Sequence, residues 1–305
     1  MPEPDPRVVL RLLPARPRRG RVIALQRSDL EAVSAAGVFD RAAGGSFNLG
    51  IDRVFGERAD QAFPLWRVAA ATLSFAAGVR HDAITGGVTQ ILHLGCGMPT
   101  APAWEHTMFP GGIRELAVDA DPVVIGIRHR QAQRERLRGS TPACIDIRDI
   151  CTVLDTARQV LDLTQPILLQ ATGVLDHLLD DDRPGEVLAA YRGALAPGSH
   201  LALSHLTPYD DPDGSDGHAA LTSLLRAYQD AGIPLTARAP EVVDSWLGPL
   251  EARGRHRAAP YLHLASGRIT DTGRDTPASR ARRRQRRPRP RPRPRPQGTT
   301  RTDDA

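Results

Sequence analysis

The sequence predicts an α/β protein with an open, doubly wound and mostly parallel sheet. Short apolar runs, such as residues 90–94 and 200–206, alternate with helix-forming stretches of about 10–15 residues. Several of the apolar runs end in glycine or aspartate, and this alternation is typical of parallel strands joined by helices. The chain has 305 residues, of which 41% are hydrophobic, so it is long enough for one large domain or two small ones.

Each strand is predicted from a short apolar run bounded by turn-forming residues. The second run ends at Asp119, and the third contains Asp146. The five predicted strands cover residues 90–94, 115–118, 143–147, 167–171 and 200–206.

Helix boundaries follow from capping residues and helix breakers. Ser28 and Glu31 form a Ser-x-x-Glu capping box, which predicts a helix that starts there and stops at Gly44 and Gly45. Pro122 suits the first turn of a later helix, because the missing N–H of proline would be unpaired there anyway. Helices are also expected over residues 62–78, 122–138, 184–195 and 219–231.

The charge of the chain is concentrated in its C-terminal tail. Residues 280–296 hold ten of the 40 basic residues and no acid, so the other 30 face 35 acids and the rest of the chain carries −5 instead of +5. A nucleic-acid-binding fold is therefore not indicated for the body of the protein. Residues 1–27 and 271–305 are rich in Arg and Pro and are predicted to be disordered. We expect nucleic acid or an acidic partner to bind only through the tail.

Cysteine usage and hydropathy predict a cytoplasmic protein. Cys96, Cys144 and Cys151 form no C-x-x-C pair. No apolar run reaches the roughly 18–20 residues of a membrane helix, and the N-terminus lacks the apolar core of a secretory signal. We expect no membrane association and no metal site, since the sequence shows no zinc-ligand pattern.

The loops after the predicted strands are the expected ligand site, because open α/β sheets bind ligands outside the carboxyl ends of their strands. Gly95 and Gly97 form a tight turn, but Thr100 replaces the third glycine of the dinucleotide pattern. Asp119 lies 22 residues beyond Gly97, a spacing that suits a carboxylate accepting both ribose hydroxyls. The carboxylate of Asp146 could accept a hydrogen bond from an adenine amino group. Each of these residues could instead serve only as a turn or helix cap.

With these loops, the chain resembles the actinobacterial family of S-adenosyl methyltransferases of unassigned substrate, within the class I S-adenosylmethionine (SAM)-dependent methyltransferases. The likeness covers about residues 34–206. Its most specific part is VFDRAAGGSFNLGIDR at residues 38–53, where the family has a run close to VYDYLLGGKDNFAADR. LGCGMPT at residues 94–100 and VDADP at residues 118–122 match the family's IGTGLPT and VDNDP.

The resemblance implies a SAM cofactor and a seven-stranded sheet. A helical cap or lid over residues 28–80 would precede a Rossmann-like domain over residues 81–270. By this resemblance, Gly95 and Gly97 would line the methionine and ribose portions of SAM, and Asp119 would hold the ribose hydroxyls. The implied cofactor-binding residues are Gly95, Gly97, Asp119, Ala120, Asp146, Ile147, Ala171 and, in the lid, Gly45, Asn48, Asp52 and Arg53.

Methyl transfer is an in-line displacement, so the enzyme mainly aligns nucleophile and methyl group and supplies a base only where the acceptor needs one. His177 follows the fourth predicted strand and His205 ends the fifth, so both are candidates to face the acceptor. Asp176 could orient His177 or act as a base. A histidine satisfied by hydrogen bonds near the sheet end explains either position equally well.

Some residues depart from the family pattern. His93 stands where the family has an acid that helps to hold the ammonium group of SAM, and Ala71 and Thr72 replace an Asn-Arg pair. The expected function is methyl transfer from SAM to a small-molecule acceptor. One alternative is a catalytically degraded relative that acts as a binding or regulatory module. Another is an NAD-dependent enzyme, which rests only on the glycine loop.

Overall fold

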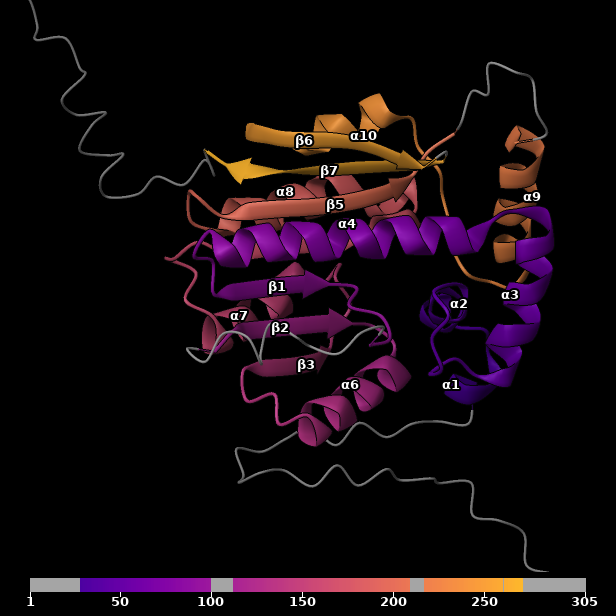
Figure 1. Cartoon of the computed structure of the whole chain (residues 1–305), viewed down its shortest axis with the longest axis horizontal. Coiled ribbons are helices and arrows are strands. Elements are labelled where there is room, and N and C mark those ends of the chain that lie inside the picture. Colours follow the sequence, from indigo (N-terminus) through magenta and orange to yellow (C-terminus); the bar gives the residue numbers. More distant parts are fainter. Residues whose placement is uncertain (1–27, 100–111, 209–216, 260, 271–305) are drawn as a thin grey trace, which may run out of the picture. The chain divides into compact units, whose positions relative to one another are not determined.

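The computed structural model describes residues 28–99, 112–208, 217–259 and 261–270, which all belong to one unit of the chain, Met1–Thr272 (Figure 1). The two segments predicted to be disordered, residues 1–27 and 271–305, lie outside the described residues. Their disorder therefore stays a prediction.

Within the described residues, seven strands form one sheet in the order β3-β2-β1-β4-β5-β7-β6. Neighbours from β3 to β5 are parallel, whereas β7 is antiparallel to both β5 and β6. The predicted class, a doubly wound and mostly parallel sheet, is confirmed. The strands are β1 (Gln90–Leu94), β2 (Arg114–Asp119), β3 (Ser140–Cys144), β4 (Leu168–Thr172), β5 (His200–Leu206), β6 (Leu250–Ala259) and β7 (Leu262–Ile269).

Helices cover both faces of the sheet (Figure 1). α4 and α6 lie on one face, and α7, α8 and α10 lie on the other. α1, α2, α3 and α9 lie beyond the carboxyl ends of the parallel strands, at the right of Figure 1. These helices are α1 (Ser28–Glu31), α2 (Ala35–Ala42), α3 (Gly50–Ala62), α4 (Leu65–Thr85), α6 (Pro122–Arg134), α7 (Ile150–Val160), α8 (Pro184–Ala194), α9 (Gly217–Asp230) and α10 (Pro240–Trp246).

Apolar side chains of the sheet divide between cores on its two faces. In β1, Leu92 and Leu94 join the cluster that includes α7 and α8, whereas Ile91 joins the cluster that includes α4. All five residues of β1 are buried, as expected for a parallel strand covered on both sides. Because side chains alternate along a strand, His93 faces the same side as Ile91.

α4 belongs to the layers of the sheet as well as to the N-terminal region. It buries Val68, Phe75 and Ile84 in the same cluster as Ile91 of β1 and Leu168 of β4. The division predicted between residues 80 and 81 therefore falls inside a helix. Among the described residues no single helix is long and apolar enough to cross a membrane, and α3 and α4 meet that criterion only as a pair bent by 102°.

The single helix predicted from Ser28 to Gly44 is wrong, because the chain forms the four-residue α1 and then a separate α2. Ser34 causes the break. Its backbone is extended, with φ −102° and ψ 130°, and its side chain accepts a hydrogen bond from the N–H of Gly37. Ser34 is thus the N-cap of a new helix. Sequence patterning also misses α3, α7 and α10.

The third strand begins earlier than predicted, at Ser140–Cys144 instead of residues 143–147. Pro142 lies within it, which is tolerated because β3 is the edge strand of the sheet. Ile147 falls in the following loop, where its carbonyl accepts from the Tyr191 hydroxyl at 2.6 Å. The predicted strand therefore includes Ile147, which is buried in the loop. The alternation of apolar and polar residues does not distinguish a buried loop residue from a strand residue.

Two fully buried carboxylates hold the segment between α2 and α3. Asp40 accepts from the N–H groups of Phe47 and Asn48 at 2.9 and 3.0 Å, and from Asn48 Nδ2 at 2.8 Å. Asp52 accepts from the N–H groups of Ser34 and Leu49, each at 2.8 Å. The two carboxylates therefore replace regular secondary structure as partners for the backbone here.

Two glycines of this region make room for these carboxylates. A Cβ atom at Gly45 would lie 2.0 Å from Asp40 Oδ1, and one at Gly37 would lie 2.1 Å from Asp52 Oδ2. A side chain at either position would displace a buried carboxylate from its donors. The physical role of Gly45 in the family-like segment is therefore close packing.

We predict that Asp40→Ala lowers the free energy of unfolding by about 2–4 kcal/mol, because it leaves buried N–H groups without an acceptor. Chemical denaturation monitored by circular dichroism measures this change. Glu57→Ala, on the exposed side of α3, is the matched control and should stay within about 0.5 kcal/mol of the wild type. Equal stability of the two variants would contradict this role of Asp40.

Candidate active site

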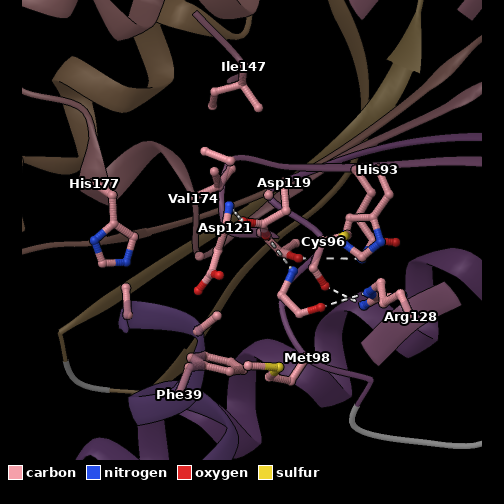
Figure 2. Close-up of a pocket in the computed structure, with 18 of the residues that line it drawn as sticks. Phe39, His93, Cys96, Met98, Asp119, Asp121, Arg128, Ile147, Val174 and His177 are labelled. Atoms are coloured by element: carbon pink, nitrogen blue, oxygen red, sulfur yellow. Dashed lines mark hydrogen bonds between the residues drawn. The ribbon is translucent and has the colours of Figure 1, made fainter. Parts of the chain in front are cut away.

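A cavity of about 770 Å³ opens at the carboxyl ends of the central strands. This is where the strand order reverses, because β1 pairs with both β2 and β4. The volume lies within the range of about 300–1,000 Å³ that is usual for small-molecule sites. Residues from the loops after β1 to β4, and from α2, α4 and α6, line it (Figure 2).

The predicted glycine turn after β1 forms one wall of the cavity. Gly95 and Gly97 have φ of +59° and +57°, a left-handed backbone that favours glycine. A Cβ atom at Gly95 would also lie 2.2 Å from Val174 Cγ2, whereas one at Gly97 would meet nothing within 4 Å. Arg128 of α6 fixes the turn by donating to the carbonyls of Cys96 and, at 2.6 Å, of Gly97 (Figure 2).

Asp119, at the end of β2, joins two loops at the bottom of the cavity. Its Oδ2 accepts from the N–H of Gly97 at 2.9 Å, and its Oδ1 accepts from the N–H of Asp121 at 3.0 Å. Burial raises the pKa of Asp119, and these two N–H bonds partly offset that effect. A carboxylate has about four acceptor positions, so two further donors, such as ribose hydroxyls, can bind.

The loop after β3 supplies the third predicted contact. Asp146, Ile147 and Arg148 all line the cavity. Asp146 is already ion-paired, at 2.6 Å from Arg148 Nη2, and this hydrogen bond lowers the pKa of the carboxyl group. Ile147 is buried, and its backbone is held by Tyr191. Ile147 and Ala120 therefore form an apolar wall for an adenine ring, which suits the ring better than the ion-paired Asp146 does.

Of the three predicted catalytic residues, only His177 lines the cavity. His205 is fully buried, with its Nδ1 3.0 Å from Asp176 Oδ1 and its Nε2 3.0 Å from Arg238 Nη1. Asp176 also accepts from the N–H of Leu206 at 2.8 Å. The predictions that His205 faces the acceptor and that Asp176 orients His177 or acts as a base are therefore corrected, since Nδ1 of His177 contacts the carbonyl of Pro234 instead. His205 Nδ1 also lies 2.6 Å from the carbonyl oxygen of Leu206. Inside the fold, both side chains thus have partners in β5, and His205 has a further one in the segment before α10.

The predicted lid contacts are also corrected, because none of the four lines the cavity. Asn48 and Asp52 are buried in the carboxylate network between α2 and α3, and Arg53 donates to Asn48 Oδ1 at 3.1 Å. Ala171 is fully buried within β4 and does not line the cavity either. The lid approaches the site through Ser34 and Phe39 instead. Ser34 Oγ donates to Asp121 Oδ2 at 2.7 Å.

Sequence reasoning misses several residues that line the cavity, and most of them lie outside the strand-end loops. Phe39 is inside the family-like segment, but its aromatic ring carries no motif of its own. Arg128 is one arginine among many in its helix, so nothing local distinguishes it. Other missed residues that line the cavity are Ser34, Met98, Gln170, Val174, Ile233 and Pro234.

A family model described as S-adenosyl methyltransferase matches residues 23–252. The chain belongs to this S-adenosyl methyltransferase family. The predicted resemblance is thereby confirmed, as is the SAM-methyltransferase class of the fold. Comparison with curated proteins gave no match. Family membership identifies neither the acceptor nor the residues that act on it.

Solved structures agree with this family. A candidate methyltransferase from Thermobifida fusca is 27% identical, with a TM-score of 0.67, and the match covers 80% of this chain and 97% of that one. A DUF574 family protein from Streptomyces avermitilis is 23% identical, also with a TM-score of 0.67, covering 80% of this chain and all of that one. The second likeness shows the fold alone.

His93, where the methyltransferase family has an acid, lies in a buried polar cluster. Its Nε2 is 3.0 Å from Gln170 Nε2, and its Nδ1 is 3.5 Å from Glu115 Oε1, too far for a good hydrogen bond. Burial, only partly offset by Glu115, lowers the pKa of His93 to about 4. The ring is therefore neutral at pH 7 and brings no positive charge to the cavity.

The negative charge of this cluster lies on the neighbouring strand. Glu115 of β2 accepts from Arg80 Nη2 at 2.5 Å. Burial raises the pKa of Glu115, but Arg80 and His93 more than offset this and hold it well below its usual range. The cavity wall thus keeps a carboxylate near position 93, although not on the family's own residue.

Two further observations concern cysteine and metal-ligating side chains. Burial raises the pKa of the Cys96 thiol to about 12, so this residue is not a thiolate nucleophile at neutral pH. In the described part of the chain, no three His, Cys, Asp or Glu side chains come together as metal ligands.

We predict that His93 makes the fold acid-sensitive. Because its folded pKa is about 4 and the ordinary value is 6.5, the unfolded chain binds the proton first as pH falls. Above pH 6.5, His93 causes no loss of folding free energy. Between pH 6.5 and pH 4, protonation of His93 in the unfolded chain progressively lowers the stability of the folded protein. His93→Gln should therefore lose about 3 kcal/mol less stability than the wild type between pH 7 and pH 4.

Urea denaturation at a series of pH values measures this difference. His218→Gln, which changes an exposed histidine on α9, is the control and should follow the wild-type pH dependence. Parallel curves for His93→Gln and the wild type would show that His93 is not held neutral by burial.

Proposed function

We propose that this protein binds SAM in the cavity described above and transfers its methyl group to a small-molecule acceptor. One observation carries the proposal. The glycine turn, the Asp119 carboxylate and the apolar Ile147 wall line one cavity at the reversal point of the sheet. In this order, the three features would contact the amino-acid part, the ribose and the adenine of SAM.

The residues present fit such a ligand. The open space at Gly97 lets the ligand approach bare backbone. Asp119 keeps acceptor positions for ribose hydroxyls while its two backbone bonds hold it in place. Two buried polar atoms of the cavity wall, His93 Nδ1 and Gln170 Oε1, have no hydrogen-bond partner, which marks the end of the cavity where a polar ligand group is expected.

When bound, SAM supplies an electrophilic methyl group on a positively charged sulfur. The chain contributes alignment, since loops after β1, β2 and β4 converge on one cavity and their glycine and aspartate residues are held by hydrogen bonds. Phe39 and Val174 narrow the cavity from opposite elements and limit the access of water.

The neutral state of His93 favours an active methyltransferase over a degraded relative. A protonated histidine would repel the ammonium group of SAM, but burial keeps the proton off His93 at pH 7. The carboxylate of Glu115 lies 3.5 Å from His93 and is ion-paired with Arg80. The departure at position 93 therefore does not by itself abolish a SAM site.

We predict that S-adenosylhomocysteine (SAH) binds with micromolar affinity and that Asp119→Ala weakens this binding about 10–100-fold, because hydrogen bonds to a charged acceptor are lost. Isothermal titration calorimetry with SAM and SAH measures the effect. Asp119→Asn, which keeps one acceptor oxygen, should bind better than Asp119→Ala.

Asp155→Ala, at an exposed position on α7, is the control and should bind SAH like the wild type. Thermal unfolding of each variant shows that it is folded. A folded wild type that binds neither SAM nor SAH would refute the proposed function, and so would an Asp119→Ala variant with unchanged affinity.

A further inference from the structure

One side of the cavity is apolar and contains a single histidine. Val174 and Leu178 come from the segment after β4, and Ile233 and Pro234 from the segment after α9. Phe39 of α2 faces this side from the lid, and Figure 2 shows His177 across the cavity from Cys96 and His93. This side therefore lies opposite the polar end formed by the glycine turn and His93.

The charged groups on the described cavity wall already have partners. Asp121 accepts from Ser34 Oγ and from the N–H of Val123, and Asp146 pairs with Arg148. Glu115 pairs with Arg80, Asp119 accepts two backbone N–H groups, and Arg128 donates to two carbonyls. None of these charged groups belongs to the apolar side formed by Val174, Leu178, Ile233, Pro234 and Phe39. A charged acceptor on that side would meet no opposite charge among the described residues, and burying it there would be unfavourable.

The tautomer of His177 follows from its hydrogen bond to Pro234. Nδ1 lies 2.7 Å from the carbonyl oxygen of Pro234, and a carbonyl can only accept, so Nδ1 carries the proton. In the neutral ring, Nε2 then has a free lone pair. The ring of Tyr228 lies alongside at an interplanar angle of 29° and helps to hold the orientation of the imidazole.

We propose that the acceptor is a neutral, apolar compound with a phenol-type hydroxyl, and that His177 Nε2 removes the hydroxyl proton. The inference rests on the proposed function. A phenol of the tyrosine type has a pKa of about 10, within reach of an imidazole base when the oxygen is methylated at the same time. An ammonium acceptor would need a free carboxylate, and a carboxylate acceptor would need a free cation.

The proton and electrons balance in this step. The O–H bond breaks, the proton moves to Nε2, and the oxygen keeps the electron pair that forms the new O–CH3 bond, while the pair of the broken C–S bond stays on sulfur. His177 then returns the proton to water. Pro234 holds the imidazolium through the same Nδ1–H bond that fixed the neutral tautomer.

The test uses three naphthalene probes of one shape on the full chain, each with and without saturating SAH. These are 2-naphthol, its methyl ether 2-methoxynaphthalene, and the anion 2-naphthoate, and fluorescence titration gives their affinities. We expect 2-naphthol to bind at least about 10-fold more tightly than 2-naphthoate, because the anion finds no free cation. We also expect wild-type protein with SAM to convert 2-naphthol into the ether.

Two variants assign the contact to His177. His177→Phe keeps an aromatic ring but loses the acceptor, so 2-naphthol affinity should fall about 10-fold while affinity for the ether changes less than about 3-fold. His177→Gln restores an acceptor but not a base, so it should recover naphthol binding without ether formation. His218→Gln, at the exposed position on α9, should match the wild type in both measurements.

Each of these measurements can overturn a stated part of the proposal. Equal binding of naphthoate and naphthol, or an equal effect of His177→Phe on naphthol and ether, would overturn the acceptor assignment. Full ether formation by His177→Gln would overturn the role of His177 as base. Naphthol binding that depends on His177 in a protein that does not bind SAH would leave the acceptor pocket standing and refute only the proposed cofactor.

Discussion

A chain of hydrogen bonds through Asp52, Ser34 and Asp121 ties the N-terminal helices to the sheet. Asp52 accepts the N–H of Ser34, Ser34 Oγ donates to Asp121 at 2.7 Å, and Asp121 caps α6 through the N–H of Val123 at 2.8 Å. Breaking one link would leave a buried or half-buried carboxylate with one of its two donors, since Asp52 also accepts from Leu49 and Asp121 accepts from both Ser34 and Val123. The position of α2, and therefore of Phe39 over the cavity, depends on this chain.

The same constraint explains why the family-like segment is rich in glycine and acids. Asp40 and Asp52 act on backbone N–H groups of their own region, and Gly37 and Gly45 leave room for them. Their function is to build a rigid cover out of irregular backbone, which would otherwise carry unpaired polar groups. The segment therefore shapes the site without lining it, apart from Phe39.

Electrostatics divide the cavity into two ends. The polar end has hydrogen-bonded charged groups and a neutral His93, and the opposite side has apolar walls and His177, which is held by the carbonyl of Pro234. In the methyl transfer proposed above, such an arrangement would let the acceptor meet the cationic donor in surroundings with little water to reorganise. With His93 on β1, the carboxylate of this part of the cavity wall is that of Glu115 on β2.

The sequence by itself determined the class of the fold, the strands β1 and β5, the glycine turn and the place of Asp119. These depend on local patterns, since a buried parallel strand is a short apolar run and its loop must turn sharply. Tertiary structure decided which polar residues face the cavity. Arg238 reaches the buried His205 from a distant segment, and Asp176 turns inward to His205 and the N–H of Leu206. The carbonyl of Pro234 instead holds His177 on the cavity wall. Spacing along the chain does not encode such partners, because they meet only when the fold is complete.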